Sequence, residues 1–403
     1  MSSPQENTPE VAATVPEASS SSTPAVPETA TVPLPATVPA PATTTTTAPV
    51  LAPGPTNLVP DDADDLDSAL GDVGSLNSGE TSIGSSIFGY RQENGRTYHA
   101  YKDGIKSTHF HVKATTMGIM LILRVEYMYP NDGLEQDRLD HLSETFKLYL
   151  DGKLHMCVFD KEKKIQSVLD VGTGTGVWAM GYGEEHPEAK VLGVDLSPIQ
   201  PNFWPPNVKF QIDDAEDLWT YSHKFDFIYS RVLMGSLQNW VQYFMQAFEN
   251  LTPGGYIETT DVCFPIRSDD GTLKPDSALA QWSDLILEAS AKIGRAINSA
   301  ELYHGQMQEA GFVDIVENVD FWPLNQWMED PKYKEIGIRN TENLVSGISG
   351  LSMALFTRVH GWSMEEVEVF LVNVRKDIMD TSIHSYIPLR TIYGRTPSQV
   401  SEN

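Results

Sequence analysis

The clearest chemical signature in this sequence is a glycine-rich turn at residues 170–176, which read Asp-Val-Gly-Thr-Gly-Thr-Gly. The apolar residues before the turn predict a buried strand, and a helix is expected directly after it. Glycine allows a backbone to turn sharply and to lie against a ligand without a Cβ in the way. A dinucleotide fingerprint needs glycine at position 177, which is Val177 here, so the spacing favours a ligand without a pyrophosphate. A tight strand-to-helix turn that binds nothing is the alternative explanation.

Acidic residues stand at the ends of the next two predicted strands. Asp195 follows the apolar residues 191–194, where a carboxylate can accept hydrogen bonds from both hydroxyls of a ribose. Asp213 and Asp214 end the following strand, where an adenine amino group would be recognised. Open α/β sheets bind ligands in the crevice outside the carboxyl ends of their strands. The alternatives are a helix N-cap for Asp195 and a solvated acidic turn for the other two.

Strand and helix patterns alternate from residue 132 onward, which indicates an α/β fold with a mostly parallel, seven-stranded sheet. The strands are expected at 167–171, 191–194, 208–212, 225–229 and 256–260, then from 312, and at 386–393. Helical spacing between 330 and 380 includes a capping-box pair, Ser363 and Glu366. A sheet does not require this helical stretch, so we interpret it as a helical cap over the substrate side.

The first 80 residues have a different composition from the rest of the chain. Pro, Thr, Ala, Ser and Val dominate them, and they contain no Lys or Arg. Such a segment cannot bury enough apolar surface to offset the entropy lost on ordering. We therefore expect a disordered tail over 1–80, an N-terminal segment over 81–134 and a main domain over 135–397. The tail is either simply solvated or an interaction arm.

The net charge of −27 restricts the partners. Eleven negative charges lie in the tail, so the rest of the chain is acidic as well. Binding to nucleic acid depends largely on neutralising phosphates, so a nucleic-acid substrate is disfavoured. Two cysteines make no disulfide framework, no signal peptide is evident, and the apolar run 117–123 is too short to span a bilayer. We expect a cytoplasmic protein, with the nucleus as the alternative.

Several longer strings resemble the LaeA-like methyltransferases of fungi. They lie at 170–176, 193–201, 213–217, 253–255, 312–314 and 393–395. The resemblance covers about residues 88–397, and the string 194–201 is its most specific part. It implies a class I methyltransferase fold, which is Rossmann-like, with S-adenosylmethionine as cofactor and a role in fungal secondary metabolism.

By position, the resemblance also assigns cofactor contacts in this chain. They fall on Asp170, Gly172, Thr173, Gly174, Gly176, Asp195, Leu196, Asp213, Asp214, Ala215 and Tyr101. Tyr98 and Tyr101 match an N-terminal family motif that we expect to close over the cofactor. The chain departs from the family at about 105–128, where it has an insert of about twenty residues. The insert is either a genuine loop or a retained intron.

The implied cofactor carries its own leaving group, so the protein has to align the reactants and exclude water. A base helps only when the acceptor loses a proton. Asp261, just beyond the fifth strand, is the candidate, and Glu258 and His304 are weaker ones. An exposed carboxylate or a surface histidine is the alternative for each. No His or Cys cluster has metal-ligand spacing, so we expect no metal.

Two functions fit these expectations. The first is a small-molecule methyltransferase of a biosynthetic pathway. The second is a LaeA-type nuclear regulator of secondary metabolism and development that acts through protein partners. The sequence contains no Lys/Arg cluster of the kind that directs nuclear import.

Overall fold

The computed structural model describes residues 89–99 and 127–398. The chain divides into two compact units, Met1–Asp72 and Val73–Asn403, and every described residue belongs to the second. The predicted tail, Tyr101 and nearly all of the predicted insert lie outside the described residues.

A seven-stranded sheet organises the described part of the chain, with the strand order β5-β4-β3-β6-β7-β9-β8. The strands from β3 to β7 pair in parallel, and β9 is antiparallel to both β7 and β8. The sheet strands are β3 Ser167–Val171, β4 Lys190–Asp195, β5 Val208–Ile212, β6 Phe225–Arg231, β7 Leu251–Val262, β8 Val313–Pro323 and β9 Tyr386–Arg395. A separate hairpin consists of β1 Arg91–Glu93 and β2 Arg96–Tyr98. The predicted mostly parallel sheet is confirmed.

The helices begin where a polar side chain can cap them in most cases. Asp132, Asn239, Ser277, Asp330 and Ser363 each accept a backbone N–H of the first turn that follows. The helical elements are α2 Gly133–Tyr149, α3 Val177–Glu185, α4 Trp240–Asn250, α5 Ala278–Lys292, η1 Ser299–Leu302, α6 Tyr303–Ala310, α7 Pro331–Leu355, η2 Phe356–His360 and α8 Met364–Met379. The predicted capping box at the start of α8 is present.

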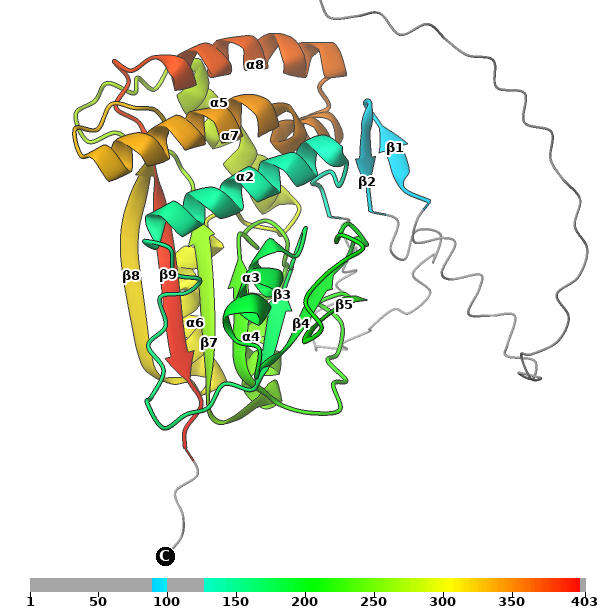
Figure 1. The fold of residues 1–403 in the computed structure, drawn as a ribbon. Coiled ribbons are helices and arrows are strands. Elements are labelled where there is room, and N and C mark those ends of the chain that lie inside the picture. Colours follow the sequence, from blue (N-terminus) through cyan, green and yellow to red (C-terminus); the bar gives the residue numbers. More distant parts are fainter. Residues whose placement is uncertain (1–88, 100–126, 399–403) are drawn as a thin grey trace, which may run out of the picture. The chain divides into compact units, whose positions relative to one another are not determined.

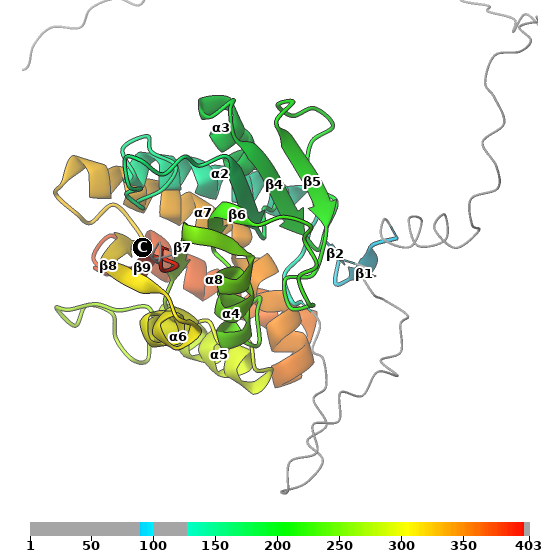
Figure 2. The ribbon, with the colours of Figure 1, turned by 90° about the horizontal axis from the view of Figure 1, so that it is seen from below.

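The two faces of the sheet are covered by different helices. Because successive side chains of a strand point to opposite faces, Val168 and Phe227 pack with residues of α3, whereas Leu169 and Ile228 pack with α4 and α6. Figure 2 shows α3 on one side of the sheet and α4 and α6 on the other. The strands are therefore buried on both faces, as parallel sheets require.

Helices α2, α5, α7 and α8 form a layer at the end of the sheet toward which β7 runs (Figure 1). Their apolar sides share one core with buried residues such as Trp282, Ile348 and Leu371. The Trp282 indole N–H donates to Ser352 Oγ at 2.8 Å, which joins α5 to α7. The helices predicted between 330 and 380 are present as α7, η2 and α8, and they lie at the carboxyl ends of the parallel strands.

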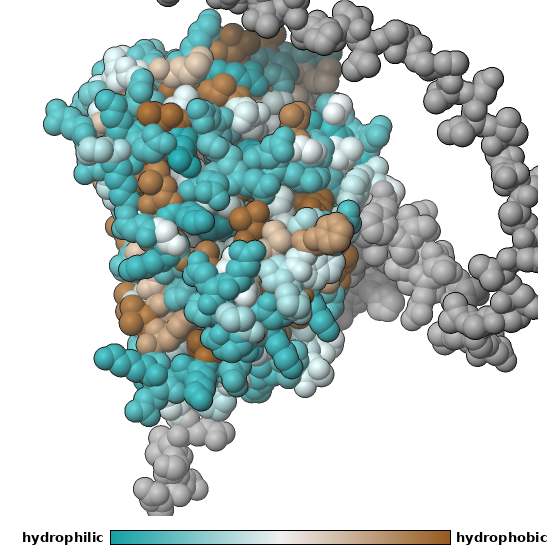
Figure 3. Space-filling model, viewed as in Figure 1, coloured by the Kyte–Doolittle hydropathy of each residue, from teal (hydrophilic) through white to brown (hydrophobic). Residues whose placement is uncertain are grey.

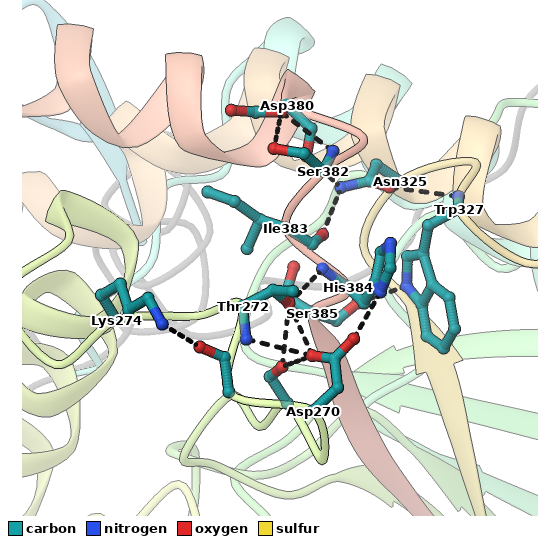
Figure 4. A network of polar contacts seen from close by, with 12 residues as sticks. Asp270, Thr272, Lys274, Asn325, Trp327, Asp380, Ser382, Ile383, His384 and Ser385 are labelled. Carbon is teal, nitrogen blue, oxygen red and sulfur yellow. Dashed lines mark hydrogen bonds and ion pairs between the residues drawn. The ribbon is translucent and has the colours of Figure 1, made fainter. Parts of the chain in front are cut away.

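A polar network ties the connections around this helical layer together (Figure 4). Asp270, in the loop before α5, and His384, between α8 and β9, are linked by a 2.6 Å contact from Oδ2 to Nδ1. Thr272 Oγ1 accepts the His384 backbone N–H at 2.8 Å and donates to Asp270 at 2.8 Å. The His384 ring stacks on Trp327, with 5.0 Å between centroids. The network fixes the point at which the chain returns to the sheet as β9.

The fifth predicted strand is longer than expected. β7 begins at Leu251 and ends at Val262, so it includes the Pro-Gly-Gly string at 253–255 as an irregular stretch. The pairing of β6 with β7 shifts register between Phe225 and Phe227 to accommodate this stretch.

None of the helices in the described ranges is long and apolar enough to cross a bilayer.

We predict that Gly337→Ala destabilises the protein. Alanine normally stabilises a helix interior by about 1 kcal/mol relative to glycine. At Gly337, in α7, a Cβ would overlap the backbone carbonyl of Asn325, which cannot move aside as a flexible side chain could. We expect a net loss of about 1–3 kcal/mol in the free energy of unfolding, measured by urea denaturation.

Gly305→Ala is the matched control, because Gly305 lies in α6 and a Cβ there meets no atom within 4 Å. It should leave stability unchanged or raise it slightly. Equal effects of the two substitutions would contradict the close approach of α7 to the backbone at residue 325.

Candidate functional site

The glycine turn joins β3 to α3 at the carboxyl edge of the sheet. Gly172, Gly174 and Gly176 have φ angles of 70°, 57° and 81°, a left-handed conformation that favours glycine. The N–H groups of Gly172 and Thr173 donate to the carbonyl of Val194 at 2.9 and 3.0 Å, which holds the turn against β4. The sequence therefore has glycine where the backbone must repeatedly adopt this conformation.

Asp195, the last residue of β4, bonds directly to the turn. Its Oδ2 accepts the Gly174 N–H at 2.9 Å, and its Oδ1 accepts the Ser197 N–H at 2.9 Å. A carboxylate offers about four lone-pair sites, so the group can accept further hydrogen bonds. Burial raises the pKa of Asp195, and backbone hydrogen bonds from Ser197, Gly174 and Leu196 act against this rise. Leu196, which follows it, is half-buried.

The acidic pair after β5 lies beside this carboxylate. The Asp213 N–H donates to the Asp195 carbonyl at 2.9 Å, so the ends of β4 and β5 meet. Asp213 Oδ2 accepts the hydroxyl of Tyr221 at 3.3 Å, and Asp214 Oδ1 accepts the Glu216 N–H at 3.0 Å. The Ala215 carbonyl accepts the Trp219 indole at 3.1 Å. The structure thus brings the predicted adenine-side residues next to the predicted ribose-side residue.

A cavity of about 50 Å³ opens on the other side of the turn, between α2, the start of α3 and the end of β6. Its lining consists of Leu139, Leu142, Ser143, Asp170, Gly172, Thr173, Gly174, Thr175, Val177, Trp178, Tyr229, Arg231 and Val232. Burial raises the pKa of Asp170 to about 7, although the Thr173 hydroxyl donates to it at 2.6 Å. Four predicted contact residues, Asp170, Gly172, Thr173 and Gly174, therefore line one cavity, whereas Asp195 and the pair after β5 lie outside it.

The N-terminal hairpin reaches the site through a chain of hydrogen bonds. The Arg96 guanidinium donates to Asp132 at 2.8 Å, and the Thr97 hydroxyl donates to Asn131 at 2.8 Å. Asn131 Nδ2 then donates to Ser197 Oγ at 3.2 Å, two residues from Asp195. The hairpin is thereby connected to the predicted ribose-side loop.

Tyr98, one of the two predicted lid residues, lies in the core of the helical layer and is 1% exposed. The guanidinium groups of Arg91 and Arg358 lie over its ring, at 5.8 and 5.1 Å from the ring centroid. It does not line the cavity described above. Tyr101 lies outside the described residues.

Asp261 lies inside β7, not beyond its end as the sequence suggested, and is 0% exposed. Its Oδ2 accepts the Tyr303 hydroxyl at 2.6 Å and its Oδ1 accepts the Met234 N–H at 3.1 Å. An acceptor molecule cannot reach a carboxylate enclosed in this way. These contacts favour a structural role for Asp261, which holds the loop after β6, and do not favour a role in proton transfer. Because the carboxylate is buried, the alternative of an exposed carboxylate is wrong.

The two weaker base candidates lie elsewhere. Glu258 is 1% exposed and accepts the backbone N–H of Met156 at 2.9 Å, so it anchors the segment before β3. Burial raises the pKa of Glu258 to about 7. His304 is half-buried on α6, the helix that covers the opposite face of the sheet from α3. Within the described ranges no group of three or more His, Cys, Asp or Glu could hold a metal ion.

Comparison with known proteins assigns the chain to a family. A family model described as a methyltransferase domain matches residues 142–317. Methyltransferase pytC of Aspergillus terreus is 36% identical over 318 residues, which cover 79% of this chain and 91% of pytC. Secondary metabolism regulator LAE1 of Cochliobolus heterostrophus is 34% identical over 76% of this chain and 95% of its own length. The chain belongs to the LaeA-like methyltransferase family.

This LaeA-like protein is an S-adenosylmethionine-dependent methyltransferase, and it has the class I methyltransferase fold. A second relative, probable methyltransferase tdiE of Emericella nidulans, is 36% identical over 66% of this chain and 83% of tdiE. Among solved structures, phosphoethanolamine N-methyltransferase 2 of Haemonchus contortus in complex with S-adenosyl-L-methionine aligns at 17% identity. That alignment covers 65% of this chain and 52% of the other, with a TM-score of 0.36.

The residues at the carboxyl edge fit a nucleoside with an amino-acid tail. The Asp195 carboxylate has lone-pair capacity left for the hydroxyls of a ribose. The turn beside it presents backbone without Cβ atoms, and the cavity beyond the turn contains one acidic and one basic side chain. A pyrophosphate would find no further glycine at 177 and only one cation among the described cavity residues.

Sequence reasoning did not select most of the cavity residues, among them Ser143, Trp178 and Arg231. Arg231 could have been found by the criterion that selected Asp195, because it also ends a parallel strand. Ser143 and Trp178 carry no such signal. They belong to α2 and α3, and only the packing of these helices over the strand ends places them in the cavity.

We predict that Asp261→Asn flattens the pH dependence of stability. Burial raises the pKa of Asp261 to about 7, whereas an unfolded chain loses this proton near pH 4. Between about pH 4 and pH 7 the folded state holds a proton that the unfolded state has lost, so the free energy of unfolding falls as the pH rises. This contribution is at most about 1.4 kcal/mol per pH unit. Asparagine abolishes it.

The measurement is urea denaturation of the wild type and the variant at pH 5 and pH 7. Asp276→Asn, which removes an exposed carboxylate, serves as the control and should behave as the wild type does. If Asp261→Asn shows the wild-type difference between the two pH values, Asp261 is ionised in the folded protein.

Proposed function

We propose that this LaeA-like protein transfers a methyl group from S-adenosylmethionine to a small molecule of fungal secondary metabolism. The glycine turn and Asp170 hold the amino-acid end of the cofactor. Asp195 and Leu196 hold the ribose, and Asp213, Asp214 and Ala215 hold the adenine. Tyr101 remains a proposed lid residue.

The observation that best supports this proposal is the set of hydrogen bonds that the Asp195 carboxylate accepts. Backbone N–H groups on both oxygens fix its orientation, and the carboxylate keeps lone-pair capacity for a ribose hydroxyl. The Asp213 N–H donates to the Asp195 carbonyl, so the segment proposed for the adenine lies directly beside the residue proposed for the ribose. The alternative of a helix N-cap is wrong, because no helix lies between Asp195 and β5.

When bound, S-adenosylmethionine supplies a methyl group activated by its sulfonium. The protein's task is then to bind, orient and exclude water. The backbone of the turn fixes one end of the cofactor, and α2 covers the cavity with Leu139 and Leu142. Thr175 Oγ1 donates to Asp140 of α2 at 2.6 Å, so this cover is attached to the turn itself.

A regulatory function is the second candidate. Secondary metabolism regulator laeA of Aspergillus fumigatus is 33% identical over 76% of this chain and of its own length. Methyltransferase pytC matches at 36% identity over 91% of its length, and the regulator LAE1 matches at 34% over 95% of its length. Coverage therefore does not separate the two candidates, and we rank the small-molecule enzyme first on the higher identity to pytC.

The hydrophilic surface and the net charge of the chain bear on which partners it can bind. The face drawn in Figure 3 is mainly hydrophilic, with apolar residues scattered over it. With a net charge of −27, the chain is poorly suited to direct contact with nucleic acid. We propose a small-molecule acceptor, no metal and no nucleic-acid partner, in the cytoplasm, and reserve protein partners and the nucleus for the regulatory alternative.

We predict that Asp195→Ala weakens binding of S-adenosylhomocysteine by about 1–3 kcal/mol, because the variant loses hydrogen bonds between a charged group and the ribose. Isothermal titration of purified protein measures this change. Asp160→Ala, which removes an exposed carboxylate, is the control. Unchanged affinity in Asp195→Ala would exclude the ribose contact, and no binding by the wild type would exclude the proposed function.

We also predict that deletion of the gene in its native host removes one methylated product and leaves other secondary metabolites in place. A pathway enzyme acts on one substrate class, whereas a regulator changes many pathways together. Comparative metabolite profiling by mass spectrometry makes the distinction. Loss of many unrelated products would support the regulatory candidate instead.

A further inference from the structure

The cavity beside the glycine turn contains an arginine, Arg231, that forms no close ion pair with a carboxylate of the described residues. Among the described residues that line it, Asp170 and Arg231 carry charge. The Arg231 guanidinium donates to Ser143 Oγ at 3.0 Å and lies 4.4 Å from the Phe146 ring centroid. No carboxylate of the described residues forms an ion pair with it within 4.0 Å. A guanidinium has five N–H donors, so several remain for a ligand.

The backbone after Arg231 is held in an unusual conformation. Val232, which follows it, has a φ of 57°, a left-handed value that is rare for a β-branched residue. The Val232 N–H donates to the Thr260 carbonyl at 2.9 Å, and the Met234 N–H donates to Asp261. These contacts from β7 stabilise the strained turn and hold Arg231 at the end of β6. Strain of this kind is common at ligand sites.

The start of α3 adds a second positive element to the same cavity. Val177 and Trp178, its first residues, line the cavity, and no side chain caps the helix there. Backbone N–H groups at a helix N-terminus favour an anion. The cavity holds a few water-sized volumes, which is the size of an amino-acid head group and too small for a complete acceptor.

We propose that Arg231 binds the α-carboxylate of the methyl donor. This inference rests on the proposed function, since the donor is the ligand whose amino-acid end fits beside the turn. Asp170 provides the complementary charge for the α-ammonium group of the same ligand. Ser143 and Phe146 of α2 are positioning residues that keep the guanidinium directed into the cavity.

Two probes that differ in the amino-acid part test the proposal by isothermal titration. S-adenosylhomocysteine contains the carboxylate, and 5′-methylthioadenosine lacks the amino-acid carboxylate and ammonium. Arg231→Met should weaken binding of S-adenosylhomocysteine at least about tenfold, as expected for lost hydrogen bonds to a charged group. Binding of 5′-methylthioadenosine should change by less than about twofold, because that probe does not reach Arg231. Arg231→Lys should restore part of the loss.

Ser143→Ala tests the positioning role and should weaken binding of S-adenosylhomocysteine alone, by a smaller factor. Arg339→Met, which removes an arginine of α7 that pairs with Glu335, is the control for loss of one arginine. Equal losses for both probes in Arg231→Met, or no loss for either, would overturn the proposal while leaving the proposed function intact. A wild type that binds neither probe would instead overturn the proposed function, and the carboxylate site with it.

Discussion

The hydrogen bond between the Gly174 N–H and the Asp195 carboxylate is the contact on which the rest of the site depends. It forms because β3 and β4 are adjacent and parallel, with Val171 opposite Val194, so the turn and the acid reach the same edge. An antiparallel partner would have brought the start of its strand to this edge and left the turn without a carboxylate. The packing of Phe210 against the glycines at 176 and 193 then fixes the distance between the turn and the neighbouring strand.

Three buried carboxyl groups show that residue type alone does not define a role. Burial raises the pKa of Asp170, Glu258 and Asp261 to about 7 in each case. Glu258 and Asp261 are occupied by backbone N–H groups and hold segments of chain in place. Asp170 accepts a hydrogen bond from a side-chain hydroxyl and lines the cavity. The difference lies in which atoms remain accessible, because only an accessible carboxylate can complement a ligand.

The helical layer and the N-terminal hairpin shape the site although they lie outside the sheet. α2 contributes Leu139 and Ser143 to the cavity, and Arg358 of η2 pairs with Glu93 of the hairpin at 2.6 Å. Asn131 carries this connection to the loop after β4. Changes in the hairpin can therefore reach the cofactor site through hydrogen bonds, without a direct contact to the ligand.

The sequence by itself determined the positions of the strands along the chain, the glycine turn and the acids at 195 and 213–214, because these features depend on residues close together in the chain. Helix capping at Ser363 is local in the same sense. Only the tertiary structure decided that Asp261 is enclosed, that Tyr98 belongs to a core and that Arg231 faces the cavity. Each of these outcomes depends on contacts between distant segments, such as β7 with α6 or β6 with α2, and on how completely those segments exclude water. Periodicity and spacing carry no information about either.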